Sequence, residues 1–259
     1  MLFLPFFVTA IIVGFVTAGL KIQFDRFFVI ILLISLAGLS VFGAINTFLW
    51  IILLGAAWVL WKNREKIKDL PAENKKKFLT IIPLSVFVGV LLGTLVFAEI
   101  SGHVLTMVIG VLALLYGLRL IFIHFKPHEF EYKNGKPTYQ KICGLLGPIV
   151  SGFLVGLVGT SLKPLKIPFA VRFGHMNLNQ VYLGNTITVF FASLFAIILH
   201  GFYLRQNMMT SSYALLGIGL WLAIHISYET TNHFFKDKWR KPFQIAIGVI
   251  LVIVAFKFL

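Results

Sequence analysis

The chain has 259 residues, of which 59% are hydrophobic and 12% are charged, and its mean hydropathy is +0.93. Soluble domains average roughly 45–50% apolar and about 25% charged residues, so this composition excludes a water-soluble domain. The longest polar stretches, 62–78 and 124–141, are too short to bury a core of their own. We therefore expect a protein that lies almost wholly in a membrane, without a soluble catalytic domain.

The formal net charge is +14, which by itself is compatible with nucleic-acid binding. Most of the basic residues, however, stand in short connectors between apolar runs, where they orient membrane helices. This placement predicts a lipid bilayer and no nucleic acid as the partner. The single cysteine, Cys143, excludes an internal disulfide and a thiolate metal cluster.

The apolar runs predict about ten helical segments, since a bilayer-spanning helix needs about 20 mostly apolar residues. In chain order they are 3–20, 27–44, 46–61, 79–97, 104–123, 142–158, 165–176, 181–203, 212–228 and 242–259. Strict alternation of apolar and polar residues is absent, which favours helices over a transmembrane barrel. The predicted fold class is an all-α polytopic membrane protein.

The connectors differ in their content of Lys and Arg, which predicts their side of the membrane. Connectors 62–78, 124–141 and 229–241 each hold at least four Lys or Arg residues and are expected to be cytoplasmic. Connectors 98–103 and 204–211 are nearly free of them and are expected outside. Ten crossings satisfy all five assignments and place both termini outside.

Short matches recur in the same order in the two halves of the chain. The matched residues are Gly14 with Gly152, Asn46 with Asn185, Thr47 with Thr186, Glu99 with Glu229, His103 with His233, and Gly110 with Gly248. An odd number of helices in each half turns the second copy upside down, so an inverted-topology repeat is predicted. We assign 1–124 to the first transmembrane repeat, 125–141 to a cytoplasmic connector and 142–259 to the second repeat.

The stretch 151–185 carries the clearest functional signal. Glycines recur every three or four residues up to Gly159, and Pro164 and Pro168 then follow four residues apart. No regular helix holds both prolines, because each removes a backbone donor and clashes with the preceding turn. Irregular backbone at membrane depth is tolerated only where protein buries it or water reaches it. The sequence therefore predicts a broken helix beside a cavity near the midplane.

Cations without acidic neighbours lie in the same stretch. Lys163, Lys166 and Arg172 stand within or beside it, and no Asp or Glu occurs between Glu131 and Glu229. Cations at membrane depth normally face a cavity and find an anion. One interpretation is that Lys163 and Lys166 only reach the outer membrane surface. The other is an anion site.

In the anion-site interpretation, backbone amides at a half-helix N-terminus bind a small oxyanion. The residues from Gly159 to Ser161, with the hydroxyls of Thr160 and Ser161, would contribute to this site together with one or more of the three cations. Arg172 is the best placed of these cations, because it lies inside a predicted short helix.

Polar pairs open one apolar helix in each half. Asn185 and Thr186 form the pair in the second half, and Asn46 and Thr47 form its counterpart. Such residues often form hydrogen bonds between membrane helices. The other interpretation is that they complete the substrate shell, since residues near the axis of an inverted repeat approach one site at the midplane.

Two pairs of Glu and His are spaced four residues apart, so each pair is predicted to share a helix face. They are Glu99 with His103 and Glu229 with His233. They are candidates for coupling protons to transport, and the alternative is that they mark membrane ends, where carboxylate and imidazole meet water.

No motif of a metal site or an enzyme accompanies these groups. His200 and His225 stand alone, without a second ligand three or four residues away. The G-x-S-x-G, H-E-x-x-H and Walker motifs are also missing from the sequence. We expect no metal, no cofactor and no enzymatic activity.

The segment GFLVGLVGTSLKPLKIPFAVRFGHMNLNQVYLGNT, residues 152–186, resembles the second-half signature of the TauE/SafE family, also called the TSUP family. Members carry two similar halves, each with a glycine-rich break, a following proline, and a patch of small residues with Thr or Asn that opens the next helix. The resemblance extends over the whole chain. In this sequence Gly159-Thr160-Ser161 replaces the usual consecutive glycines, and the first half has no proline between Gly14 and Arg26.

The resemblance implies transport of small sulfur-containing anions, such as sulfite, thiosulfate, sulfonates or sulfoacetate, across the plasma membrane. We therefore expect a secondary transporter that works by alternating access around a midplane anion site. Its expected partners are a sulfur oxyanion, the bilayer and, as a candidate, a coupling proton. The alternative is a membrane-embedded enzyme or an assembly scaffold.

Overall fold

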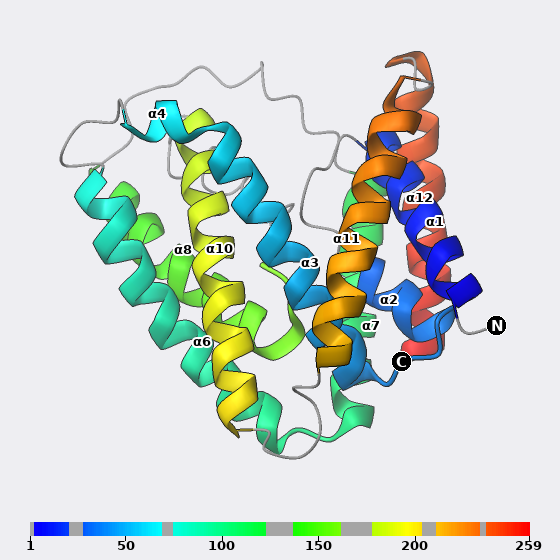
Figure 1. The fold of residues 1–259 in the computed structure, drawn as a ribbon, viewed down its shortest axis with the longest axis horizontal. Coiled ribbons are helices and arrows are strands. Elements are labelled where there is room, and N and C mark those ends of the chain that lie inside the picture. The colour runs from blue at the N-terminus through cyan, green and yellow to red at the C-terminus, as the bar shows by residue number, and fades with distance from the viewer. Residues whose placement is uncertain are drawn as a thin grey trace. The chain divides into compact units, whose positions relative to one another are not determined.

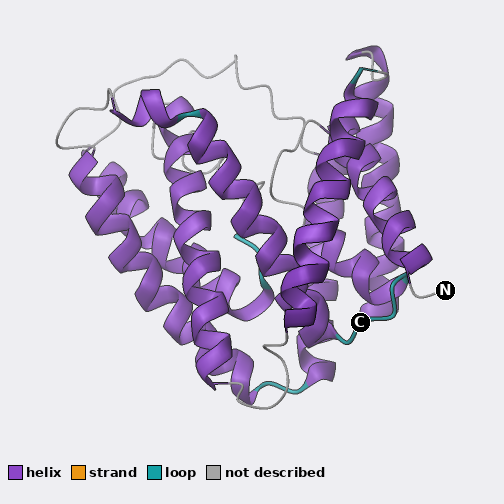
Figure 2. Cartoon of the chain, viewed as in Figure 1, coloured by secondary structure: helices purple, strands orange, loops and turns teal. Residues whose placement is uncertain are grey.

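The computed structural model describes residues 3–20, 28–68, 75–122, 137–161, 178–203, 211–233 and 237–259. Every regular element in these ranges is a helix, which confirms the predicted all-α fold class (Figure 2). Five of the described helices are long and apolar enough to cross a membrane. The protein is therefore a multi-pass membrane protein.

The helices are labelled in Figure 1 and follow one another closely along the chain. They are α1 (Phe3–Leu20), α2 (Phe28–Ser35), α3 (Val41–Lys62), α4 (Arg64–Lys68), the π-helical turn η1 (Lys77–Ile81), α6 (Ile82–Glu99), α7 (Gly102–Phe122), α8 (Pro137–Val158), α10 (Leu178–Tyr203), α11 (Ser211–Asn232) and α12 (Asp237–Phe258). The predicted segment 165–176 lies outside the described residues.

The prediction of one continuous segment over 27–44 was wrong. Helix α2 ends at Ser35, and α3 begins at Val41. Between them Gly38 has φ +68°, a left-handed conformation that glycine adopts without a steric penalty. The Ser40 hydroxyl then accepts a hydrogen bond from the Gly43 amide at 3.2 Å, which is the N-cap of α3. A turn glycine and a cap residue thus divide a run that looks uniformly apolar.

The described chain forms two compact units, and each draws on both halves of the sequence. Unit 1 comprises Met1–Ile51, Ile100–His124 and Met208–Leu259, and unit 2 comprises Ile52–Glu99 and Phe125–Asn207. A helix of one half packs mainly with helices of the other half, so the units are a division by contact, and the repeats remain a prediction from the sequence.

Unit 2 is built on the packing of α6 against α8, with α10 beside both (Figure 1). The closest approach occurs at four glycines, two on each helix: Gly89, Gly93, Gly152 and Gly156. A Cβ on Gly152 would lie 2.5 Å from the Val86 carbonyl oxygen, and one on Gly156 would lie 2.6 Å from that of Val90. Small residues four apart let membrane helices meet backbone to backbone. Larger residues at these positions would separate α6 from α8.

Unit 1 contains α7 packed on α12 and α1 packed on α11. Along the first pair, a Cβ on Gly110 would lie 3.3 Å from the Ala255 carbonyl oxygen, and a Cβ on Gly117 would lie 2.8 Å from that of Gly248. The contact partner moves back along α12 as the chain advances along α7. The two helices therefore run antiparallel.

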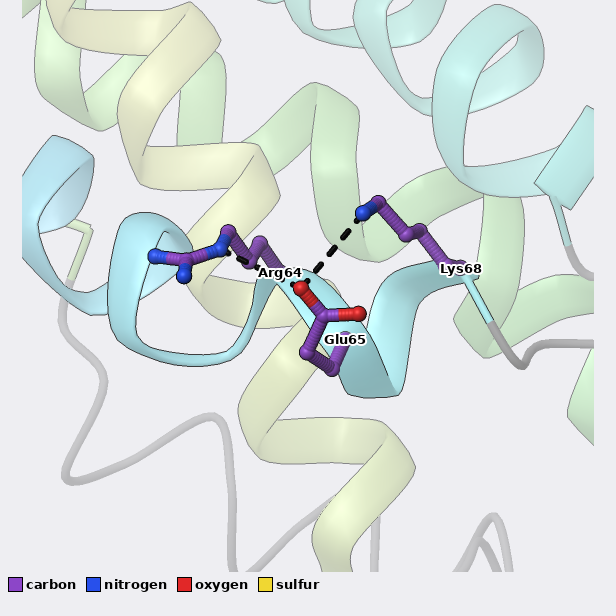
Figure 3. A network of polar contacts seen from close by, with 3 residues as sticks. All are labelled: Arg64, Glu65 and Lys68. Carbon is purple, nitrogen blue, oxygen red and sulfur yellow. Dashed lines mark hydrogen bonds and ion pairs between the residues drawn. The ribbon is translucent and has the colours of Figure 1, made fainter.

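The connector 62–78, predicted to be cytoplasmic, contains the short helix α4. Glu65 Oε1 accepts hydrogen bonds from Arg64 Nε at 3.2 Å and from Lys68 Nζ at 3.4 Å (Figure 3). Arg64 also lies over the Trp61 ring, 4.8 Å from its centre. Tryptophan beside basic residues is typical of membrane–water interfaces. These exposed ion pairs each stabilise the fold by at most about 1 kcal/mol.

Candidate functional site

Helix α8 ends inside unit 2, at the glycine-rich segment that the sequence singled out. Its last residue is Val158, and the Gly159 amide donates to the Val155 carbonyl oxygen at 2.9 Å. Gly159 has φ +75°, which a residue with a Cβ rarely adopts. Upstream, Gly156 lies against Val90 and Thr94 of α6. Both belong to the candidate membrane span Phe78–Glu99, so the terminus of α8 lies at membrane depth.

Two hydroxyl side chains follow directly after this terminus and are buried. Thr160 is 1% exposed and Ser161 is 4% exposed. The Ser161 hydroxyl has no hydrogen-bond partner among the described residues. A buried polar group without a partner costs about 1–3 kcal/mol, which a ligand that binds it recovers. Ser161 is therefore suited to bind a ligand that accepts or donates a hydrogen bond.

A histidine from α10 closes the last turn of α8. His200 Nε2 donates to the Gly156 carbonyl oxygen at 2.9 Å, and it must carry a proton because a carbonyl only accepts. The His200 ring stacks on Phe97 of α6, with ring centres 4.3 Å apart and planes 6° apart. His200 is 3% exposed. One side chain thus ties together α6, α8 and α10.

Thr94 adds another buried hydroxyl near Gly156. It is fully buried, and its Oγ1 has no hydrogen-bond partner in the described parts of the chain. Thr188 and Ser193 of the same unit behave differently, since each donates to a carbonyl four residues earlier, at 2.8 Å. A Cβ on Gly156 would lie 3.1 Å from the Thr94 amide nitrogen. The backbone of Thr94 therefore lies beside the last turn of α8.

Comparison with known protein families agrees with the resemblance of the α8 segment. The family model described as sulfite exporter TauE/SafE matches residues 6–258, which is nearly the whole chain. The chain belongs to the TauE/SafE family. No curated protein and no solved structure matches it in the corresponding searches.

The polar pairs of this TauE/SafE protein lie in different units. Asn46 and Thr47 lie on α3 in unit 1, where Asn46 Nδ2 donates to the Phe42 carbonyl oxygen at 3.1 Å. Asn185 and Thr186 lie on α10 in unit 2, each pair near the start of its helix. Thr186 donates to its own helix, at Tyr182. Thr47 Oγ1 and Asn185 Oδ1 are buried without a partner among the described residues.

Within unit 2, the contacts do not bring Asn185 beside the end of α8. Its neighbour Gly184 lies against Phe78 at the start of the α6 span, whereas Gly156 lies against Thr94 near the end of that span. On α10, Asn185 precedes His200, which bonds to Gly156, by fifteen residues, or about 22 Å at 1.5 Å per residue. The two groups therefore lie at different levels of unit 2.

The three cations predicted for the TauE/SafE site, Lys163, Lys166 and Arg172, lie outside the described residues. The prolines of the predicted break, Pro164 and Pro168, also lie there. The break is thus described only up to Ser161, and α10 begins at Leu178.

The predicted helix face shared by Glu99 and His103 was wrong. Helix α6 ends at Glu99 and α7 begins at Gly102, where the Ser101 hydroxyl accepts from the Val104 amide at 3.3 Å as an N-cap. Glu229 lies in the last turn of α11, and His233 follows the end of that helix. All four side chains are exposed, and no ion pair joins either couple in the described residues.

No group of three or more His, Cys, Asp or Glu side chains capable of holding a metal ion occurs in the ranges that the structure describes. The residues that sequence reasoning missed are His200 and Thr94. His200 was set aside because no second histidine stands nearby in the sequence. A lone ionisable group in an apolar run is costly unless it has a partner, and this was the available signal.

Proposed function

We propose that this TauE/SafE protein is a secondary transporter of small sulfur oxyanions, with sulfite as the first candidate. Thiosulfate, sulfonates and sulfoacetate are the further candidates. In this proposal the protein lies in the plasma membrane, and alternating access of two inverted repeats moves the anion past the interrupted helix end at Gly159.

One observation carries the placement of the anion. Ser161 is buried directly after a helix that ends at membrane depth, and its hydroxyl has no partner in the described chain. A desolvated oxyanion needs donors that stay in place when water is excluded. Thr160, Ser161 and the amides of this segment supply such donors, and Lys163, Lys166 and Arg172 are the candidate cations.

The contacts of α7 with α12 support the inverted repeat. The sequence match of Gly110 with Gly248 relates Gly117 to Ala255 at the same offset. The repeat thus exchanges Gly110 with Gly248 and Gly117 with Ala255. If the two helices are related by symmetry, a contact of Gly110 with Ala255 requires a contact of Gly248 with Gly117, and both contacts occur. The antiparallel course of these equivalent helices favours an axis in the membrane plane over one along the membrane normal.

We propose that Asn185 and Thr186 lie on the route of the anion and not in the Ser161 shell, because Asn185 lies about 22 Å along α10 from His200, the partner of Gly156. Asn46 and Thr47 are the corresponding candidates of unit 1. Glu99, Glu229, His103 and His233 remain candidates for proton coupling, and their exposure at helix ends also fits groups that only mark the membrane edge.

Purified protein in proteoliposomes tests the function. We expect accumulation of radiolabelled sulfite down an imposed gradient, with competition by other sulfur oxyanions and none by chloride. Turnover of sulfite without net movement would support the alternative of a membrane-embedded enzyme. The absence of both movement and turnover would contradict both the transporter and the enzyme.

Variants in the same vesicles test the site and the coupling. Thr160→Ala and Arg172→Gln are expected to weaken sulfite binding about tenfold or more, because a hydrogen bond to a charged group contributes about 1.5–3 kcal/mol. Glu99→Gln and Glu229→Gln should remove the response of flux to a pH gradient if these groups carry the proton. An unchanged response in both variants would assign them to the membrane edge.

A further inference from the structure

Helix α8 of unit 2 and helix α1 of unit 1 end in the same manner. At the end of α8, His200 Nε2 donates to the Gly156 carbonyl oxygen at 2.9 Å. At the end of α1, Arg240 Nη1 donates to the carbonyl oxygens of Ala18 at 3.0 Å and Gly19 at 3.4 Å. In each unit, a basic side chain from another helix therefore holds terminal carbonyls.

Such caps answer a need that is general to helix ends. The last four carbonyls of a helix have no partner within it, and water that would bind them is scarce at membrane depth. The carbonyl end also carries a partial negative charge, equivalent to about half an elementary charge. At α8 this negative end immediately precedes Thr160 and Ser161. An anion bound there would be repelled unless a donor offsets the charge.

We propose that His200 is a positioning residue of the anion site: its ring N–H holds the end of α8 in place and offsets the negative pole of that helix. Arg240 in the same way holds the end of α1 and offsets the negative pole of α1. The effect on anion affinity rests on the proposed function. The capping itself does not, because it concerns only the two helix ends.

The surroundings of His200 fit a fixed donor. Phe97, itself fully buried, stacks on the imidazole and sets the plane of the ring. The bond joins residues 44 positions apart, so it links α10 to the end of α8 without help from local sequence. His200 lies on α10 of unit 2, and its partner Gly156 lies three residues before Gly159. The position of His200 therefore determines where the segment 159–161 begins.

Two substitutions of similar polarity test whether the hydrogen bond to Gly156, and not merely a polar side chain at position 200, holds the end of α8. In His200→Gln the amide nitrogen lies near the position of Nε2 and can still donate to Gly156. In His200→Asn the shorter side chain falls short of that carbonyl. His225, which stacks on Trp221 in unit 1, provides the matched control as His225→Asn.

The first measurement is amide hydrogen exchange of residues 156–161 in detergent without substrate. We expect exchange in His200→Asn to be about tenfold faster or more, because the last turn of α8 opens locally. His200→Gln and His225→Asn should stay within about threefold of the wild type. Unchanged exchange in His200→Asn would overturn the proposal.

The second measurement is sulfite affinity by calorimetry for the same variants. His200→Asn is expected to bind sulfite about tenfold more weakly, and His200→Gln should restore affinity. Equal affinity in both would overturn the electrostatic part of the proposal. If wild-type protein binds no sulfite while exchange responds as expected, the cap stands and only the proposed function fails.

Unit 1 provides an independent arm. Arg240→Met removes the donor at Ala18 and Gly19, whereas Lys241→Met removes an exposed charge from the neighbouring position of α12. Exchange of the amides of residues 17–20 should rise about tenfold in Arg240→Met and stay unchanged in Lys241→Met. An equal response of both variants would show that net charge, and not capping, stabilises the end of α1, and would overturn the proposal for Arg240.

Discussion

Two helix interfaces can be compared, that of α6 with α8 in unit 2 and that of α11 with α1 in unit 1. In the predicted repeat α6 corresponds to α11 and α8 to α1, yet the two interfaces differ in the atoms that fill the contact. In unit 2, Gly89 and Gly93 face the backbone of α8, at Ile149 and Phe153. In unit 1, Gly14 first meets the side chain of Ser227. Backbone cannot be moved or trimmed, whereas a side chain can. The comparison predicts that the loss caused by a larger residue can be compensated at the interface of unit 1 and not at that of unit 2.

The largest expected effect is that of Gly93→Ala in unit 2. The new Cβ would collide with the Phe153 carbonyl, and overpacking of this kind costs about 1–3 kcal/mol or more. Thermal unfolding in detergent should show Tm roughly 2–12 °C lower. The matched control is Gly147→Ala on α8, where a Cβ meets nothing within 4 Å. Equal Tm values for the two variants would remove the distinction between the glycines.

In unit 1, Gly14→Ala should also destabilise the protein, but a second substitution should recover part of the loss. Ser227→Gly removes the side-chain atoms nearest to the new Cβ and leaves the Ser227 backbone carbon at 3.0 Å. A double-mutant cycle should give a favourable coupling of about 0.5–3 kcal/mol. Simple additivity would show that backbone limits this interface as well.

At the end of α8, one substitution is expected to lower sulfite affinity without lowering the stability of the protein. Ser161→Ala removes a buried hydroxyl that has no partner in the described chain, so the free energy of unfolding should stay unchanged or rise. Sulfite affinity should fall about tenfold, since a hydrogen bond to a charged group is lost. A drop in stability with unchanged affinity would mean that Ser161 serves packing alone.

The smallest effect is expected in the turn between α2 and α3 of unit 1. Gly38→Ala places a Cβ in open space, so only the left-handed φ of +68° opposes it. The cost should be about 1–2 kcal/mol, and Asn, which tolerates this conformation better, should cost less. Equal stability of the Ala and Asn variants would show that the turn can adopt another conformation.

Much of the fold was accessible from the sequence, because long apolar runs are strong signals. The predicted segment 3–20 coincides with α1, and the segment 142–158 ends where α8 ends. The end of α6 was predicted within two residues, whereas the division at Gly38 was missed, since it depends on a turn glycine and a cap residue within an apolar run. Caps act through single hydrogen bonds, which hydropathy does not register.

The site was only partly accessible for a different reason. The glycine-rich segment before Ser161 was visible, because glycine and proline patterns are local. The contact of His200 with Gly156 joins distant residues, and no local pattern announces it. The sequence assigned Arg240 to a connector expected to be cytoplasmic and did not predict its hydrogen bond to the end of α1.

The bond between Arg240 and Ala18 spans 222 residues, and this has a consequence for biosynthesis. Ribosomes add about 5–20 residues per second, so α1 enters the membrane roughly 10–40 s before its cap is made. Unit 2 is complete earlier, since none of its segments extends beyond Asn207. Nascent α1 must therefore wait without α11 and α12, and a released chain that ends at residue 207 would contain every segment of unit 2 but leave α1 without these two partners.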